Sequence, residues 1–224
     1  MMATGVGFEG CSGLTGSLTI PGSVTFIGNS AFSGCVGLGG SLTFLDGEST
    51  LTITTSSSDT PFSDYDISKI YLGRNIRYNS TNSPFKDKTN ITEVIIGKNV
   101  TSVGEQTFDR CYNIENVITL NPNPPTITSS TFTSATQKLA SLHVPNGRLT
   151  IYKYTPYWED FLNIVDDAEA AGIDDVRIDD ETVNRQDVTI YNLQGTRLSV
   201  KSIEDLQGYP KGIYIVNGKK YFNR

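Results

Sequence analysis

A segment of about two dozen residues recurs along this 224-residue chain. FEGCSGLTGSLTI (8–20) and FSGCVGLGGSLTF (32–44) align with an offset of 24 positions. Five apolar positions coincide at that offset: Phe8/Phe32, Cys11/Cys35, Leu14/Leu38, Leu18/Leu42 and Ile20/Phe44. A unit this short cannot bury its hydrophobic side alone, so the copies are expected to stack on one another.

The repeat continues with some drift. ISKIYLGRNI (67–76) aligns with ITEVIIGKNV (91–100), again at an offset of 24, and Phe62, Phe85 and Phe108 follow one another at 23. A degenerate copy runs from Phe132 to position 144, so about six coils are readable. The spacing between Phe32 and Phe62 is 30, and the extra LTITT (51–55) predicts an additional short strand.

Each short apolar run, such as Leu18-Thr19-Ile20, predicts one strand of a parallel sheet. The first and third residues of the run point inward and the middle one points outward. Successive Phe and Cys side chains then form internal ladders, in which the three cysteines are small buried thiols. A disulfide between Cys11 and Cys35 is the alternative, because strands of adjacent coils lie about 4.8 Å apart.

Two of the copies carry a family resemblance. LTIPGSVTFIGNSAFSGCVGL (18–38) and VIIGKNVTSVGEQTFDRCYNI (94–114) resemble the leucine-rich repeat of the BspA-like bacterial surface proteins. The resemblance covers roughly residues 5–165. It implies a mostly β, right-handed solenoid with a parallel sheet on one side, and a protein-binding role at the surface of a Bacteroidetes cell.

After Leu139 the repeat gives way to an aromatic segment that resembles the end of the same family, and we expect a cap with short helical turns. Stacking of a carbohydrate on Trp158 and its neighbouring tyrosines is the alternative use of these rings. The expected domains are a capped solenoid (1–165), an acidic linker (166–181) that includes Asp166 and Asp167, and a small antiparallel β module (182–224).

The C-terminal module rests mainly on one hairpin. Residues 212–216 and 219–222 flank Asn217-Gly218, a strong two-residue turn signal, and a second hairpin is expected between 188–190 and 197–199. The segment resembles C-terminal modules of Bacteroidetes exported proteins, akin to type IX secretion sorting domains. A purely structural role is the alternative.

Composition and motifs argue against nucleic-acid binding, a membrane span, metal binding and catalysis. A net charge of −6 disfavours nucleic acid, and no run of about 18 apolar residues predicts a membrane span. The sequence lacks a phosphate loop and zinc-type cysteine spacing, and its one histidine, His143, has no recognisable nucleophile beside it. We therefore expect no enzyme activity, no metal and no cofactor.

The repeat offers a surface instead. Thr19, Thr43, Tyr71, Ile95, Ile118 and His143 are expected to form an outward row along the sheet, beside a second row that includes Lys69 and Glu93. In the first row, Tyr71, Ile95 and Ile118 would form an exposed apolar stripe, unless a loop or the tail covers it.

We take Tyr71, Ile95, Ile118, His143, Lys69 and Glu93 as candidate partner-binding residues. The function expected is that of a secreted or cell-surface, adhesin-like protein that binds host or bacterial surface proteins. Glycan binding and a role as a structural spacer are the alternatives. No signal peptide precedes the repeats in this chain, and the N-terminal edge is expected to self-associate because an uncapped coil exposes strand edges.

Overall fold

A computed structural model describes residues 7–56 and 60–168, three C-terminal strands (190–192, 212–216 and 219–223) and residue 198. The chain divides into two compact units, Met1–Ala170 and Ala171–Arg224. Each unit is described by itself.

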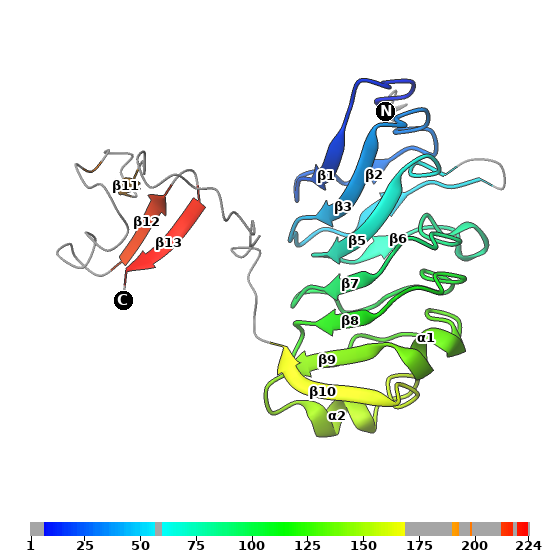
Figure 1. Ribbon diagram of the computed structural model, residues 1–224, viewed down its shortest axis with the longest axis vertical. Helices are drawn as coiled ribbons and strands as arrows, with labels where there is room; N and C mark the ends of the chain where they lie inside the picture. Colours follow the sequence, from blue (N-terminus) through cyan, green and yellow to red (C-terminus); the bar gives the residue numbers. More distant parts are fainter. Residues whose placement is uncertain are drawn as a thin grey trace. The chain divides into compact units, whose positions relative to one another are not determined.

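The first unit is built on a parallel sheet of seven strands (Figure 1). In order across the sheet they are β1 (Gly16–Ile20), β3 (Leu38–Phe44), β5 (Asp66–Leu72), β7 (Glu93–Ile96), β8 (Asn116–Thr119), β9 (Ser141–Pro145) and β10 (Asn163–Ala168). Each coil of the repeat contributes one strand, and the cap contributes β10. The predicted mostly β solenoid of about six coils is thus confirmed.

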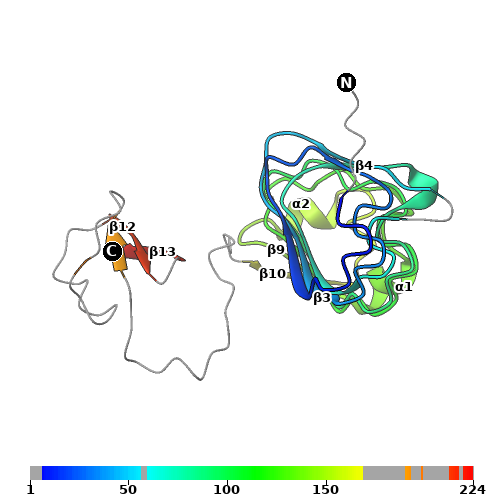
Figure 2. The ribbon, with the colours of Figure 1, turned by 90° about the horizontal axis from the view of Figure 1, so that it is seen from above.

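A second, smaller parallel sheet lies in the first three coils. It consists of β2 (Phe26–Ile27), β4 (Leu51–Ile53) and β6 (Ile76–Arg77). The strand predicted in LTITT is β4, whereas β2 and β6 were not predicted because two residues carry no readable alternation. Viewed along the stack, the coils superimpose around one interior, with the main sheet on one side and β4 across from it (Figure 2).

Stacked phenylalanines run through that interior, and we name each coil after its phenylalanine. Neighbouring rings lie 5.2–6.1 Å apart with interplanar angles of 16–18°. The column comprises Phe8, Phe32, Phe62, Phe85, Phe108 and Phe132. The predicted phenylalanine ladder is confirmed.

The last coil and the cap contain the short helices α1 (Ser134–Leu139) and α2 (Leu149–Lys153), and a 3-10 turn, η1 (Ser80–Asn82), lies farther up the chain. In the cap, Trp158 is fully buried, and its indole nitrogen donates to the carbonyl oxygen of Pro125 at 2.7 Å. Its ring packs against Phe132, Tyr152 and Phe161. The alternative in which a sugar stacks on Trp158 is therefore wrong, because neither face of the indole reaches the surface.

Strand β10 extends through Ala168, so Asp166 and Asp167 belong to the main sheet rather than to the expected linker. Asp166 accepts from the backbone N–H of Gly147, at 2.8 Å for its nearer oxygen, and Asp167 contacts His143. These contacts tie both carboxylates to β9 and the turn after it.

In the second unit, β12 (Gly212–Val216) pairs antiparallel with β13 (Lys219–Asn223) and with β11 (Ile190–Asn192). The expected pairing of 188–190 with 197–199 falls mostly outside the described residues.

One buried cation links coils that are not neighbours. Arg74 follows β5 in the third coil, is 1 % exposed, and donates to the carbonyl oxygens of Pro21 and Gly22 in the first coil at 2.9 and 2.7 Å. On the way its side chain passes Gly47 of the second coil, where a Cβ would lie 3.2 Å from the Arg74 Cδ. A Cβ at position 47 would also lie 3.2 Å from the carbonyl oxygen of Gly22, so a larger residue there would crowd the Arg74 side chain.

Candidate functional site

The outward row of the main sheet is in register from coil to coil. Thr19 pairs with Thr43, Thr43 with Tyr71, Tyr71 with Ile95, Ile95 with Ile118, and Ile118 with His143. The structure thus brings Tyr71, Ile95, Ile118 and His143 together as one row, as the repeat offset predicts.

The row is longer than expected. Val165 of β10 pairs with His143 and extends the row into the cap. Sequence reasoning missed it because the cap departs from the repeat, although Val165 lies 22 residues after His143. The apolar side chains on this face are therefore Tyr71, Ile95, Ile118 and Val165.

The apolar stripe is less exposed than expected. Tyr71, Ile95 and Ile118 are half-buried rather than fully exposed. The Tyr71 hydroxyl donates to a carboxylate oxygen of Asp46 at 2.7 Å and lies over Gly97, where a Cβ would approach it to 2.9 Å. Burial raises the pKa of Tyr71, and the hydrogen bond to Asp46 adds to that effect. Tyr71 is thus held against the sheet and closes one end of the apolar strip.

A polar row runs beside the apolar one. Lys69 pairs with Glu93 at 3.4 Å, and their side chains are 57 % and 23 % exposed. The row continues in register through Asn116, Ser141 and Asn163. It gives the face a hydrogen-bonding border of mixed charge.

His143 joins the two rows at the lower end of the face. One ring nitrogen, Nδ1, lies 2.7 Å from a carboxylate oxygen of Asp167, and the other, Nε2, lies 3.2 Å from the side-chain oxygen of Asn116. His143 is therefore fixed from both sides. The contact with Asp167 was not predicted, because that residue was assigned to the linker.

A column of hydrogen-bond donors runs along another side of the solenoid. It is formed by the residue three positions after each phenylalanine from Phe8 to Phe108, and we call it the donor column: Cys11, Cys35, Tyr65, Lys88 and Cys111. From the second coil onward, each of these side chains donates to a backbone carbonyl oxygen of the preceding coil. The acceptors are, in order, Phe8, Ser41, both Ser63 and Tyr65, and Phe85.

The cysteines divide by position in this column. Cys35 and Cys111 are buried, as predicted, and all three cysteines are free, so the alternative disulfide is absent. The expectation that Cys11 is buried was wrong: it is exposed, because no described coil lies beyond it.

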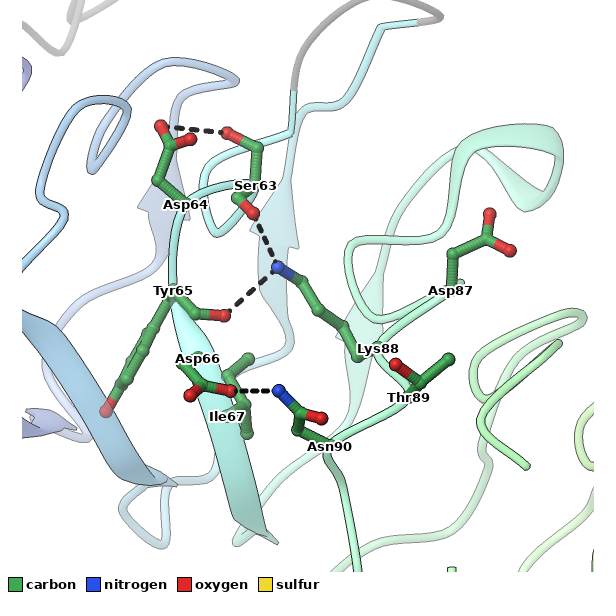
Figure 3. Close-up of a pocket in the computed structure, with 9 residues that line it drawn as sticks. All are labelled: Ser63, Asp64, Tyr65, Asp66, Ile67, Asp87, Lys88, Thr89 and Asn90. Atoms are coloured by element: carbon green, nitrogen blue, oxygen red, sulfur yellow. Dashed lines mark hydrogen bonds between the residues drawn. The ribbon is translucent and has the colours of Figure 1, made fainter. Parts of the chain in front are cut away.

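Lys88 lies in a pocket of about 290 Å³ between the coils of Phe62 and Phe85 (Figure 3). Its ammonium donates to the carbonyl oxygens of Ser63 and Tyr65 at 2.7 and 3.1 Å. Burial lowers the pKa of Lys88, and the nearby carboxylates of Asp64 and Asp66 oppose that shift.

The carboxylates around this pocket already have partners. Asp64 accepts from the backbone N–H of Gly34 at 2.8 Å, and Asp66 accepts from the side-chain amide of Asn90. Asp87 pairs with Arg110 at 3.2 Å. The pocket is thus a junction between two coils whose polar groups satisfy one another, and its geometry does not set up a nucleophile with a base.

Within residues 7–56 and 60–168 and the described C-terminal strands, no cluster of three or more His, Cys, Asp or Glu residues is placed to hold a metal ion. In the same part of the chain, no helix has the length and apolarity needed to cross a membrane.

The comparisons agree with this architecture. The family described as BspA type Leucine rich repeat region (6 copies) matches residues 6–137 and 81–164. No curated protein and no solved structure matches the chain. Solenoids of this kind are typically non-catalytic scaffolds that present extended binding surfaces. The continuous Phe column, the in-register sheet and the family match together show that this chain belongs to the BspA-type leucine-rich repeat proteins.

Proposed function

We propose that the outward face of the seven-stranded sheet binds another protein, and that the chain acts as a secreted or cell-surface, adhesin-like repeat protein. The observation that carries the proposal is the in-register row of Tyr71, Ile95 and Ile118, which continues through His143 to Val165. A regular parallel sheet holds these side chains in place, so little conformational entropy is lost when a partner binds them.

The chemistry of the face defines the kind of partner. The apolar row is bordered by the Lys69–Glu93 pair and by amide and hydroxyl groups, which is the pattern of a non-obligate protein interface with a polar rim. A partner that places aliphatic or aromatic side chains over Ile95 and Ile118 would bury the apolar row and meet Lys69 and Glu93 with opposite charges. The proposed partners are host or bacterial surface proteins.

The test is binding to immobilised extracellular-matrix proteins and mucins. The wild-type chain is expected to bind at least one of them, and Ile95→Ser with Ile118→Ser is expected to lose that binding. Because both side chains are half-buried and point outward, the double variant should keep its fold, as circular dichroism and a melting curve would show.

A matched control removes apolar area elsewhere. Val36→Ser with Tyr112→Ser changes two side chains that are 69 % and 56 % exposed and lie outside the strands, and this variant should bind as the wild type does. Wild-type binding by the Ile95→Ser, Ile118→Ser chain would overturn the assignment of the face. If binding to mucin is lost after enzymatic deglycosylation, the ligand is a glycan rather than a protein.

We also propose that residues 182–224 are a C-terminal module of the type IX sorting kind and that the protein comes from the Bacteroidetes. Support for both is the sequence resemblance. Export of a reporter that carries residues 182–224, in a Bacteroidetes host with and without that secretion system, would test them.

A further inference from the structure

The second, smaller sheet is interrupted between the third and fourth coils. Arg77 pairs with Thr52 one coil earlier, and Ser102 pairs with Thr126 one coil later. Arg77 and Ser102 do not pair with each other in the described part of the chain. On the main sheet the same two coils stay paired through β5 and β7. The interruption is therefore confined to one side of the solenoid.

Two side chains of the third coil span the interruption. The side-chain oxygen of Asn75 accepts from the backbone N–H groups of Thr101 and Ser102 at 2.9 and 3.2 Å. The Tyr78 hydroxyl donates to the backbone carbonyl oxygen of Glu105 at 3.0 Å. These hydrogen bonds join the two coils where the sheet does not, and they hold both side chains in place.

A pocket of about 320 Å³ lies at the interruption, at the lower end of the range of about 300–1,000 Å³ that is typical of ligand pockets. It is lined by Asn75 and Tyr78 and by four exposed residues: Thr50, Arg77, Ser102 and Glu105. These residues belong to the second, third and fourth coils, each of which has a described coil on either side. The walls of the pocket are thus formed within the stack.

The four exposed side chains make this pocket different from the pocket at Lys88, whose polar groups satisfy one another. The side chains of Thr50, Arg77, Ser102 and Glu105 form no hydrogen bond or ion pair with any other described residue. Their capacity for hydrogen bonding is therefore available to a bound molecule.

The chemistry of these groups selects the class of ligand. The Arg77 guanidinium can only donate hydrogen bonds, the Glu105 carboxylate can only accept them, and the hydroxyls of Thr50 and Ser102 can do both. A matching ligand donates and accepts at several neighbouring positions, as the hydroxyl groups of a sugar do. Arg77 and Glu105 have opposite charges, so an anion attracted by one is repelled by the other, and a neutral ligand is favoured.

We propose that this pocket is a binding site for a neutral sugar, which would accept hydrogen bonds from Arg77 and donate them to Glu105. The half-buried Ile76 also lines the pocket and offers an apolar contact to the C–H groups of the ring. A free amino acid or a short peptide would pair its two charges with Arg77 and Glu105, but it would leave the hydroxyls of Thr50 and Ser102 without partners. A sugar uses all four groups.

The test is saturation-transfer NMR of the full chain with glucose, galactose, mannose and N-acetylglucosamine, and with glycylglycine as the zwitterionic probe. At least one of the sugars is expected to show saturable binding, and glycylglycine is expected to show none. The absence of binding to all four sugars would overturn the proposal. Binding of glycylglycine alone would assign the pocket to a peptide and would also overturn it.

Variants locate the binding. Arg77→Ala and Glu105→Ala each remove a charged group that hydrogen-bonds to the sugar, so each should weaken binding by about tenfold or more. Lys98→Ala and Glu159→Ala are the matched controls, because they remove exposed charges outside the pocket and should leave the affinity unchanged. Unchanged affinity in both Arg77→Ala and Glu105→Ala would place the sugar elsewhere and overturn the proposal.

This site is separate from the face proposed to bind protein. The second sheet, marked by β4 in Figure 2, lies across the solenoid from the main sheet. Ile95→Ser with Ile118→Ser should therefore bind sugar as the wild type does, and Arg77→Ala should keep the binding to protein. Loss of sugar binding in the Ile95→Ser, Ile118→Ser chain would assign the sugar to the outward face of the main sheet instead.

Discussion

The thiol of Cys111 donates a hydrogen bond to the carbonyl oxygen of Phe85, 3.1 Å away and one coil earlier. Cys35 makes the same contact with Phe8 at 3.0 Å. The cysteine of this repeat thus joins coils through a main-chain acceptor, in addition to filling space beside the phenylalanine column.

Cys111→Ala removes this hydrogen bond and leaves a small cavity in the core. We expect the free energy of unfolding to fall by about 1–2 kcal/mol. Cys11→Ala is the matched control, and because Cys11 is exposed it should change stability by less than about 0.5 kcal/mol. Urea denaturation followed by circular dichroism measures both. Equal losses in the two variants would contradict the role of the contact between coils.

Alkaline pH should weaken the fold partly through the same thiol. Burial raises the pKa of Cys111 from its ordinary value of 9.0 to about 12. The unfolded chain therefore releases this proton first as the pH rises, so the stability that the thiol contributes is complete below pH 9 and is lost between about pH 9 and 12. Denaturation across this range should show a shallower decline for Cys111→Ala than for the wild type. Parallel profiles would contradict the assignment.

Lys88→Cys tests whether the donor column prefers a thiol. The substitution removes a partly desolvated ammonium and places at position 88 the side chain that Cys35 and Cys111 supply in other coils. We expect stability to increase by about 1 kcal/mol near neutral pH.

The pH dependence gives a second measurement for Lys88. Its pKa lies below the ordinary value of 10.5, so between the two values the unfolded wild-type chain binds more protons and this group's contribution to stability rises with pH. The rise should be missing from Lys88→Met, which has no group to titrate at this position. If Lys88→Cys is instead less stable than the wild type, the two hydrogen bonds from the Lys88 ammonium to carbonyl oxygens stabilise the fold by more than the burial of its charge destabilises it.

The cap depends on one buried hydroxyl. Tyr152 is fully buried, and its hydroxyl contacts the side-chain oxygen of Thr119 at 2.7 Å and donates to the carbonyl oxygen of Asn121 at 2.8 Å. Tyr152→Phe leaves that carbonyl oxygen without this donor and should lower the free energy of unfolding by about 1–3 kcal/mol. Tyr154→Phe changes a side chain that is 80 % exposed and should be neutral in the same thermal melts.

Much of the solenoid could be predicted because its repeat is local and regular. The offset of 24 fixes which residues lie above one another, so it places Tyr71 beside Ile95 and stacks Phe8 on Phe32 without further information. The same offset predicted the order of residues in the outward row of the main sheet.

The errors arose where tertiary contacts override the repeat. Tyr71 is half-buried because its hydroxyl reaches Asp46, 25 residues earlier, and Cys11 is exposed because no described coil packs on its outer side. Packing of Trp158 in the cap was expected, and its burial and donor contact with Pro125 exclude the alternative in which a sugar stacks on it. None of these contacts has a periodic signal in the sequence.

Arg74 alters how the stack should come apart. In a solenoid each coil touches its immediate neighbours, so stability is close to a sum of single-coil and nearest-neighbour contributions, and ends can fray one coil at a time. The reach of Arg74 from the third coil to Pro21 and Gly22 in the first adds a next-nearest-neighbour coupling. If the first coil unfolds, the buried guanidinium of Arg74 in the third coil loses its two carbonyl acceptors. The first three coils should therefore unfold as a single cooperative block.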